Sequence, residues 1–160
     1  MEAIQLKPIG IIHSPFNDLK NMPIQPTGAK GINGEIELYE KYVDGIKDLD
    51  GFSHIILLYH FHKANGYSLS VVPFLDKQEH GLFATRAPKR PNPIGLSIVK
   101  ITRIEENKIF ISDVDILNGT PVLDIKPYVP KFDYRKNVRI GWLEKDKINL
   151  EETKADDRFI

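Results

Sequence analysis

Short apolar runs alternate with clusters of turn-forming residues along the chain, and this pattern predicts a protein built mainly from β-strands. Residues 34–39 (GEIELY) alternate between apolar and polar positions, which is typical of a half-buried strand. Residues 54–62 (HIILLYHFH) form the most apolar run and are expected to be a central strand. Further strands are expected at 4–13, 69–75, 82–86, 93–104, 108–117, 121–129 and 138–144, with residues 106–108 as a hairpin connection.

Helical spacing is found in a single segment, residues 40–52, where apolar residues recur at 43, 46 and 49 although Gly45 weakens the helix. About eight short strands with at most one or two short helices predict a mainly β fold, an antiparallel barrel or sandwich. A doubly wound sheet is excluded because it needs a helix after nearly every strand. The chain also has neither GxGxxG nor GxxxxGK[ST], so a nucleotide-like cofactor would be held without a glycine-rich turn.

The bulk composition excludes several classes of function. With 160 residues, a single domain over 1–160 is expected, and 22 basic residues balance 22 acidic ones, so any anion site must arise from local arrangement. The absence of cysteine excludes disulfides, thiolate catalysis and Cys-ligated zinc. No apolar run approaches ~20 residues and no signal-peptide pattern is present, so no membrane partner is expected.

The segment 80–104 is the first candidate binding site, since it carries five Lys or Arg residues and no acidic residue. Arg86, Lys89 and Arg90 are interleaved with prolines at 88, 91 and 93, which fix the backbone from which the cations project. Such a loop suits recognition of a carboxylate or phosphate, and Gly95 would let the backbone approach a ligand closely. The alternative is an exposed loop with solvated charges.

Two polar segments offer further candidates. His60 and His62 share one face of the apolar run with Ile56 and Leu58, and they could contact a ligand, bind a metal or be partly buried imidazoles. For metal binding, no third ligand is obvious by spacing, so we predict no metal site.

Asp113 and Asp115 share one face of a strand. They could share a proton, accept hydrogen bonds from a ligand's ribose or amino group, or merely flank the turn at Asn118–Gly119.

The long loop 14–34 is the last candidate, because loops of this length in compact domains are usually functional or disordered. Gln25 lies between Pro23 and Pro26, so its amide, which both donates and accepts, projects from a fixed backbone. This placement favours contact with the edge of a heterocycle. A surface loop is the alternative interpretation.

Five segments, in this order, resemble the TsaA-like family, the family of tRNA methyltransferase O: IGIIHSPF, PIQPTG, GFSHIILLYHFH, GLFATRAPKRPNPIGLSIVKI and GTPVLDIKPYVP. The resemblance covers about residues 6–132 and implies a small β-barrel that binds S-adenosylmethionine without a Rossmann sheet. It also implies a cytoplasmic homodimer that methylates N6 of threonylcarbamoyladenosine beside the tRNA anticodon. Residues from about 133 to 160 would form a C-terminal extension with a frayed end.

The resemblance also implies which residues contact the cofactor: Gln25, Pro26, Thr27, His62, Lys63, Arg86, Leu96, Asp113, Val114 and Asp115. Arg86 would pair with a carboxylate of the cofactor or substrate, and Lys89 and Arg90 would approach RNA phosphates. No catalytic base is assigned. The chain departs from the family pattern at His13, where Arg is common, and at Asn118, where Asp is common. It also lacks the extra C-terminal region of longer members.

Two other functions remain open at this point. The chain could be a module that binds S-adenosylmethionine without catalysis, or an RNA-binding barrel that uses no cofactor. A plain RNA binder would more often interleave aromatic residues with its cations, and the basic loop has no aromatic residue between Arg86 and Arg103.

Overall fold

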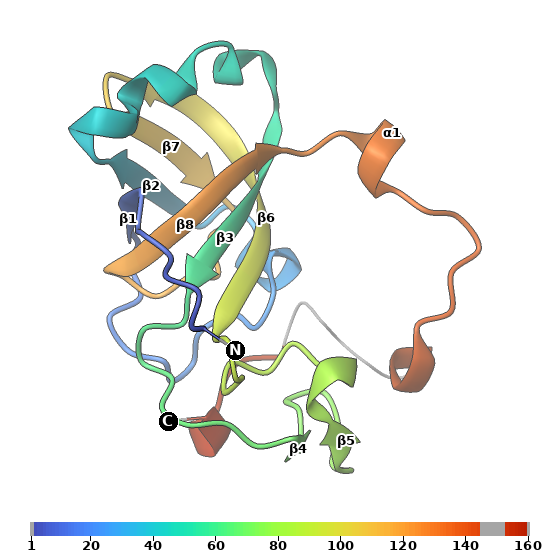
Figure 1. Ribbon diagram of the computed structural model, residues 1–160. Helices are drawn as coiled ribbons and strands as arrows, with labels where there is room; N and C mark the ends of the chain where they lie inside the picture. Colours follow the sequence, from blue (N-terminus) through green and yellow to red (C-terminus); the bar gives the residue numbers. More distant parts are fainter. Residues whose placement is uncertain (1, 145–152, 160) are drawn as a thin grey trace.

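The computed structural model describes residues 2–144 and 153–159, and the centre of this region is a closed barrel (Figure 1). The barrel strands are β1 (Gly10–His13), β2 (Asn33–Leu38), β3 (His54–His60), β6 (Ile94–Glu105), β7 (Lys108–Ser112) and β8 (Thr120–Pro127). They pair antiparallel in the order β1-β2-β7-β6-β3-β8, and β8 closes the barrel by pairing with β1. The predicted antiparallel barrel is therefore confirmed, with β3 as a central strand between β6 and β8.

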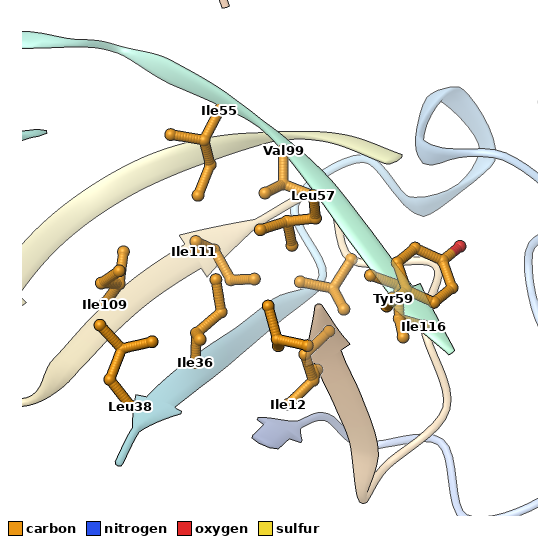
Figure 2. Close-up of a cluster of buried hydrophobic side chains, with 12 residues drawn as sticks. Ile12, Ile36, Leu38, Ile55, Leu57, Tyr59, Val99, Ile109, Ile111 and Ile116 are labelled. Carbon is orange, nitrogen blue, oxygen red and sulfur yellow. The ribbon is translucent and has the colours of Figure 1, made fainter. Parts of the chain in front are cut away.

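The barrel interior is the main hydrophobic core (Figure 2). Side chains alternate between the two faces of each strand, so β3 buries Ile55, Leu57 and Tyr59 while the residues between them stay half-buried outside. The same alternation fills the interior from the other strands with Ile12, Ile36, Leu38, Val99, Ile109, Ile111 and Val122. Burying one such side chain contributes about 1.5–3 kcal/mol, so this core fixes the strand register.

The expected hairpin is present, because β6 ends at Glu105, β7 begins at Lys108, and these two residues pair. After β7 the chain leaves the ladder, so the strand expected over 108–117 is shorter than predicted. Val114 and Ile116 there contribute fully buried side chains to the same core. Asp113 takes a left-handed conformation with φ 67°, which turns the chain across the end of the barrel.

A small second sheet lies outside the barrel and replaces two of the predicted strands. It pairs β4 (Ser70–Val71) with β5 (His80–Gly81), so the strand expected over 69–75 has two residues and stops before Pro73. The strand expected over 82–86 is a 3₁₀ turn, Leu82–Ala84, in which the Thr85 side chain donates a hydrogen bond to the Leu82 carbonyl. This turn sets the direction in which Arg86 leaves the sheet.

The strand predicted over 138–144 is wrong: residues 141–144 form a 3₁₀ turn, Gly141–Glu144, after the α-helix α1 (Pro130–Asp133). A closed barrel has no free edge strand, so it could not take up an additional strand. The helix predicted over 40–52 is instead two 3₁₀ segments, Glu40–Ile46 and Leu49–Gly51. No helix in the described part of the chain is long and apolar enough to cross a membrane.

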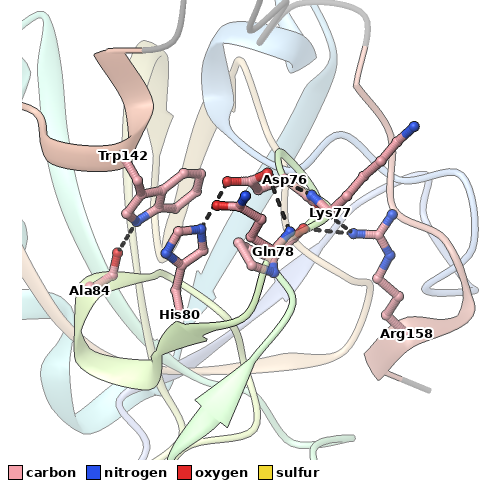
Figure 3. Close-up of polar contacts among 8 residues, drawn as sticks. Asp76, Lys77, Gln78, His80, Ala84, Trp142 and Arg158 are labelled. Atoms are coloured by element: carbon pink, nitrogen blue, oxygen red, sulfur yellow. Dashed lines mark hydrogen bonds and ion pairs between the residues drawn. The ribbon is translucent and has the colours of Figure 1, made fainter.

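Residues 153–159 pack against the loops outside the barrel. Ala155 exchanges backbone hydrogen bonds of 2.8 and 2.9 Å with Met22 and Asn21, and Phe159 is buried beside Phe74. The Arg158 guanidinium donates to the carbonyls of Pro73 and Asp76 (Figure 3). Within the predicted C-terminal extension, hydrogen bonds and apolar burial therefore connect these residues to the loops, while residues 145–152 and 160 lie outside the described residues.

Candidate ligand-binding site

A cavity of about 1230 Å³ lies at the end of the barrel where β3 ends and β6 begins. Its walls come from the long loop before β2, the segment after β7, the basic proline loop and the C-terminal segment. Small-molecule sites usually enclose about 300–1,000 Å³, so this cavity has room for one cofactor and part of a second molecule.

Most residues predicted to contact the cofactor line this one cavity. They are Gln25, Pro26, Thr27, His62, Lys63, Arg86, Leu96, Asp113 and Asp115. Val114 does not, because its side chain is fully buried in the barrel core. Of the two further residues expected at RNA, Arg90 lines the cavity and Lys89 does not. The fold thus brings together segments that are far apart in the sequence.

Gln25 and Arg86 meet directly across the cavity wall, where the Arg86 guanidinium donates a 3.0 Å hydrogen bond to the Gln25 amide oxygen. Gln25 lies before the 3₁₀ turn Pro26–Ala29, whose Gly28 N–H donates to the Gln25 carbonyl. A few residues later, the Gly31 N–H donates to the Asp113 carboxylate at 2.8 Å. Asp113 therefore ties the long loop to the barrel end, and Gln25 is held at a fixed position.

Asp115 is the most perturbed carboxyl group in the cavity. The Ser97 hydroxyl donates to it at 2.7 Å, and the Tyr59 hydroxyl lies 3.0 Å from the same Ser97 oxygen. Because Ser97 has one proton to donate, Tyr59 donates to Ser97 and the three groups form a chain. Burial raises the pKa of Asp115 from 3.8 to about 6, against the opposing effects of Ser97 and the Arg86 charge. Burial also raises the pKa of Tyr59.

His62 lies just beyond the end of β3, where its backbone N–H donates to the His60 carbonyl at 2.7 Å. Burial lowers the pKa of His62, and the Lys63 ammonium lowers it further, so both effects favour the neutral imidazole. Its Nδ1 lies 3.4 Å from the Thr120 hydroxyl. A neutral imidazole can accept or donate a hydrogen bond without adding charge to the cavity.

Among the described residues, three side chains outside the cavity meet the geometry for a metal ion: His13, Glu35 and Glu37. None of them belongs to the His60 and His62 pair considered from the sequence. Their carboxylates already have cationic or imidazole partners, since Glu35 pairs with Lys108 and Glu37 with His13, both at 2.8 Å.

Arg90 has a structural role in the basic proline loop, because its guanidinium donates to the carbonyls of Thr85 and Ala87 at 3.0 and 3.2 Å. Gly95 lines the cavity, where it was expected to let the backbone approach a ligand, and it also has a second role. A Cβ built on Gly95 would lie 2.2 Å from the Tyr59 ring, so this glycine makes room for a buried side chain of the same protein.

Sequence reasoning missed the C-terminal wall of the cavity, formed by Trp142, Leu143, Ala155, Asp156 and Phe159. The Trp142 indole donates to the Ala84 carbonyl at 2.8 Å (Figure 3), which ties this wall to the turn before Arg86. No periodicity marks these contacts in the sequence. Ser97 was detectable, since it is a polar residue at a buried-face position of β6, where it is 1% exposed.

The fold and the cavity define a small antiparallel β-barrel protein with a ligand-sized site at one barrel end. The sequence profile of the tRNA-methyltransferase O N-terminal domain matches residues 11–134. The chain therefore belongs to the tRNA-methyltransferase O family, which confirms the resemblance found in the sequence.

Relatives carry two kinds of name, binding protein and methyltransferase. A protein from Pyrococcus abyssi, named a probable S-adenosyl-L-methionine-binding protein, is 56% identical over 153 residues, which is 96% of this chain and 83% of the relative. The tRNA (adenine(37)-N6)-methyltransferase of Escherichia coli is 37% identical over 81% of this chain, and the match spans 60% of that enzyme. A crystal structure of TrmO from Pseudomonas aeruginosa has a TM-score of 0.74 and 38% identity, covering 88% of this chain and 63% of that one.

Both departures from the family pattern lie outside the cavity-lining set. His13 pairs with Glu37 on the barrel exterior. The Asn118 side chain accepts from the Ser14 N–H and donates to Asn17, so it anchors the start of the long loop. An ionised aspartate at position 118 has no hydrogen-bond donor, so it could not donate to Asn17 as Asn118 does.

Proposed function

We propose that this protein is an S-adenosylmethionine-dependent tRNA methyltransferase that acts on N6 of threonylcarbamoyladenosine next to the anticodon. The observation that carries the proposal is the convergence of the predicted cofactor contacts on one cavity in a member of this family. Relatives named as tRNA (adenine(37)-N6)-methyltransferases support the reaction and the position. Relatives named as S-adenosyl-L-methionine-binding proteins support the cofactor.

The chemistry of the lining fits this cofactor. S-Adenosylmethionine carries a carboxylate, two cationic groups and an adenine, and it supplies a methyl group on a positively charged sulfur. The Arg86 guanidinium can pair with the carboxylate, and the ionised Asp115 can hold a cationic group. Gln25, fixed by Arg86, can bind a heterocycle edge through its amide. The lining is mostly apolar, which suits the rest of an adenosine-sized ligand.

The residues of the cavity contribute mainly by positioning and by excluding water. A sulfonium methyl is already activated, so the alignment of donor and acceptor accounts for much of the barrier. The sulfur loses its positive charge when the methyl group is transferred. An apolar environment, which stabilises the charged sulfonium only weakly, therefore favours the transfer. The target nitrogen carries a carbamoyl group, which makes its proton more acidic than that of an ordinary adenine amine, so a modest base suffices.

The partners in this proposal are a tRNA anticodon loop and a second copy of the chain, in the cytoplasm. Arg86, Lys89 and Arg90 form a cationic segment at the cavity that would contact the phosphates of the RNA.

The outer face of β6 exposes Ile94, Leu96 and Ile98 at 37–44%, and this apolar stripe would be covered in a homodimer. Leu96 also lines the cavity, so a second copy there would lie next to the bound cofactor.

A second candidate is an S-adenosylmethionine-binding module without catalysis. The observation that favours it is the name carried by two similar relatives, 56% and 42% identical, which are described as S-adenosyl-L-methionine-binding proteins and not as methyltransferases. Such a module would bind the cofactor and transfer no methyl group. An RNA-binding barrel without a cofactor is the third class, and it would bind RNA with steep salt dependence and no response to S-adenosylmethionine.

Two experiments distinguish the three candidate functions: calorimetry with S-adenosylmethionine, and an assay of methyl transfer to tRNA with and without threonylcarbamoyl groups. We expect one cofactor per chain and transfer only to the threonylcarbamoylated tRNA. Arg86→Ala should weaken cofactor binding about 10- to 150-fold, since hydrogen bonds to charged groups are worth about 1.5–3 kcal/mol. Arg103→Ala, at the far end of β6, is the control and should bind normally. Unchanged binding by Arg86→Ala would refute the assignment of that residue.

A further inference from the structure

Several aromatic side chains on the cavity lining have no part in the predicted cofactor contacts, and two of them, Phe83 and Trp142, belong to turns joined by a hydrogen bond. Phe83 belongs to the turn Leu82–Ala84 and is 75% exposed, and Trp142 belongs to the turn Gly141–Glu144. The Trp142 indole N–H donates to the carbonyl of Ala84, the residue after Phe83 (Figure 3). Both residues therefore line one cavity and belong to turns that are bonded to each other, although they come from different regions of the chain.

Trp142 is held in place before any ligand binds. One face of its ring stacks on the His80 imidazole, with centroids 4.6 Å apart and planes at 19°. The His80 Nε2 lies 2.9 Å from the Asp76 carboxylate, so the imidazole is fixed as well (Figure 3). A ring fixed in this way loses little conformational freedom when a ligand packs against it.

Phe83 also has a cationic neighbour. The Arg90 guanidinium lies 5.9 Å from the centroid of the Phe83 ring, and Arg86 is exposed two residues after Ala84. Aromatic faces next to arginines are the usual arrangement for unpaired nucleotides, since each base stacks on a ring while its phosphate meets a cation. No aromatic residue lies between Arg86 and Arg103, but Phe83 precedes Arg86 by three residues, and the fold adds Trp142 from a distant part of the chain.

We infer that Phe83 and Trp142 form the surface on which the target purine of the RNA substrate stacks. The inference rests on the proposed function and identifies the part of the cavity that binds the substrate. A base must leave its stack to reach a reactive site, and an exposed phenyl ring replaces part of the stacking that it loses. The base would then lie beside Arg86, which contacts Gln25 in the predicted cofactor group.

The test uses a labelled anticodon stem-loop RNA containing threonylcarbamoyladenosine and measures its binding by fluorescence anisotropy. Phe83→Ala should weaken RNA binding about 5- to 150-fold, which corresponds to about 1–3 kcal/mol of base stacking. Phe83→Tyr keeps the ring and should bind like the wild type. Phe132→Ala removes a similarly exposed phenyl, 70% exposed and outside the cavity lining, and should have no effect.

Two further measurements separate stacking from other roles. Trp142 is the single tryptophan of the chain, so its fluorescence should be quenched when the RNA binds, and less so in Phe83→Ala. The affinity for S-adenosylhomocysteine, measured by calorimetry, should be the same in wild type and Phe83→Ala.

Three results would overturn the inference: RNA binding unchanged by Phe83→Ala, an equal loss of S-adenosylhomocysteine affinity, or a changed oligomeric state in sedimentation. The second would assign the ring to the cofactor, and the third would assign it to a contact between copies of the chain. Failure of the proposed function is a separate result, since it appears as a wild-type protein that binds no S-adenosylmethionine.

Discussion

Replacing Asp115 with asparagine should make the protein more stable above neutral pH. Burial raises the pKa of Asp115 from 3.8 to about 6, so the folded state resists ionisation of this group. One pKa unit corresponds to about 1.4 kcal/mol, which gives a cost of about 3 kcal/mol once the carboxyl is ionised. Asparagine has similar shape, keeps an oxygen that can accept from Ser97, and carries no charge.

The sign of the pH dependence follows from the raised pKa. Below about pH 3.8 the carboxyl is protonated in both the folded and the unfolded states, and it does not penalise folding. Between pH 3.8 and about 6 the unfolded state releases its proton first, so stability falls as the pH rises. Above about pH 6 the carboxyl is ionised in both states, and its burial lowers the stability of the folded protein by the full amount.

Thermal unfolding of wild type and Asp115→Asn at pH 3.5 and pH 8 measures this cost, since all other titrating groups are common to both proteins. We expect the variant to melt about 6–12 °C higher at pH 8, using about 2–4 °C per kcal/mol for a chain of this size, and close to the wild type at pH 3.5. A melting-temperature difference that is the same at both pH values would refute the reasoning. The variant should also bind S-adenosylmethionine more weakly, because the proposed partner of a cationic group is gone.

Two further substitutions test the packing around the site. Gly95→Ala places a methyl group against the buried Tyr59 ring and should lower the free energy of unfolding by about 1–3 kcal/mol in chemical denaturation. Gly45→Ala, where a Cβ meets nothing within 4 Å, is the matched control, and equal losses in the two would contradict this account. Phe159→Ala removes an apolar contact with Phe74 and should increase hydrogen exchange in residues 153–159 with little change in the barrel. Unchanged exchange there would show that other contacts hold the segment.

Much of the barrel was predictable because its strands obey local rules. Alternation in residues 34–39 and the apolar run at 54–62 reflect the two faces of a strand, and that periodicity survives in any fold that buries one face. The failures lie where the chain leaves the barrel. Residues 82–86 and 138–144 have strand-like composition, and each contains a 3₁₀ turn instead of a strand, while the closed barrel offers no free edge with which either could pair.

The sequence by itself determined the strands of the barrel, the rigidity of the proline loop and, through its motifs, the family and most of the residues that meet at the cavity. Only the tertiary structure decided that Gly95 accommodates Tyr59, that Ser97 links Tyr59 to Asp115, and that Trp142 closes one wall. The physical reason is the separation along the sequence of the residues that interact. Strand periodicity and turn chemistry act between neighbouring residues, whereas these contacts and the raised pKa of Asp115 depend on which distant segments exclude water together.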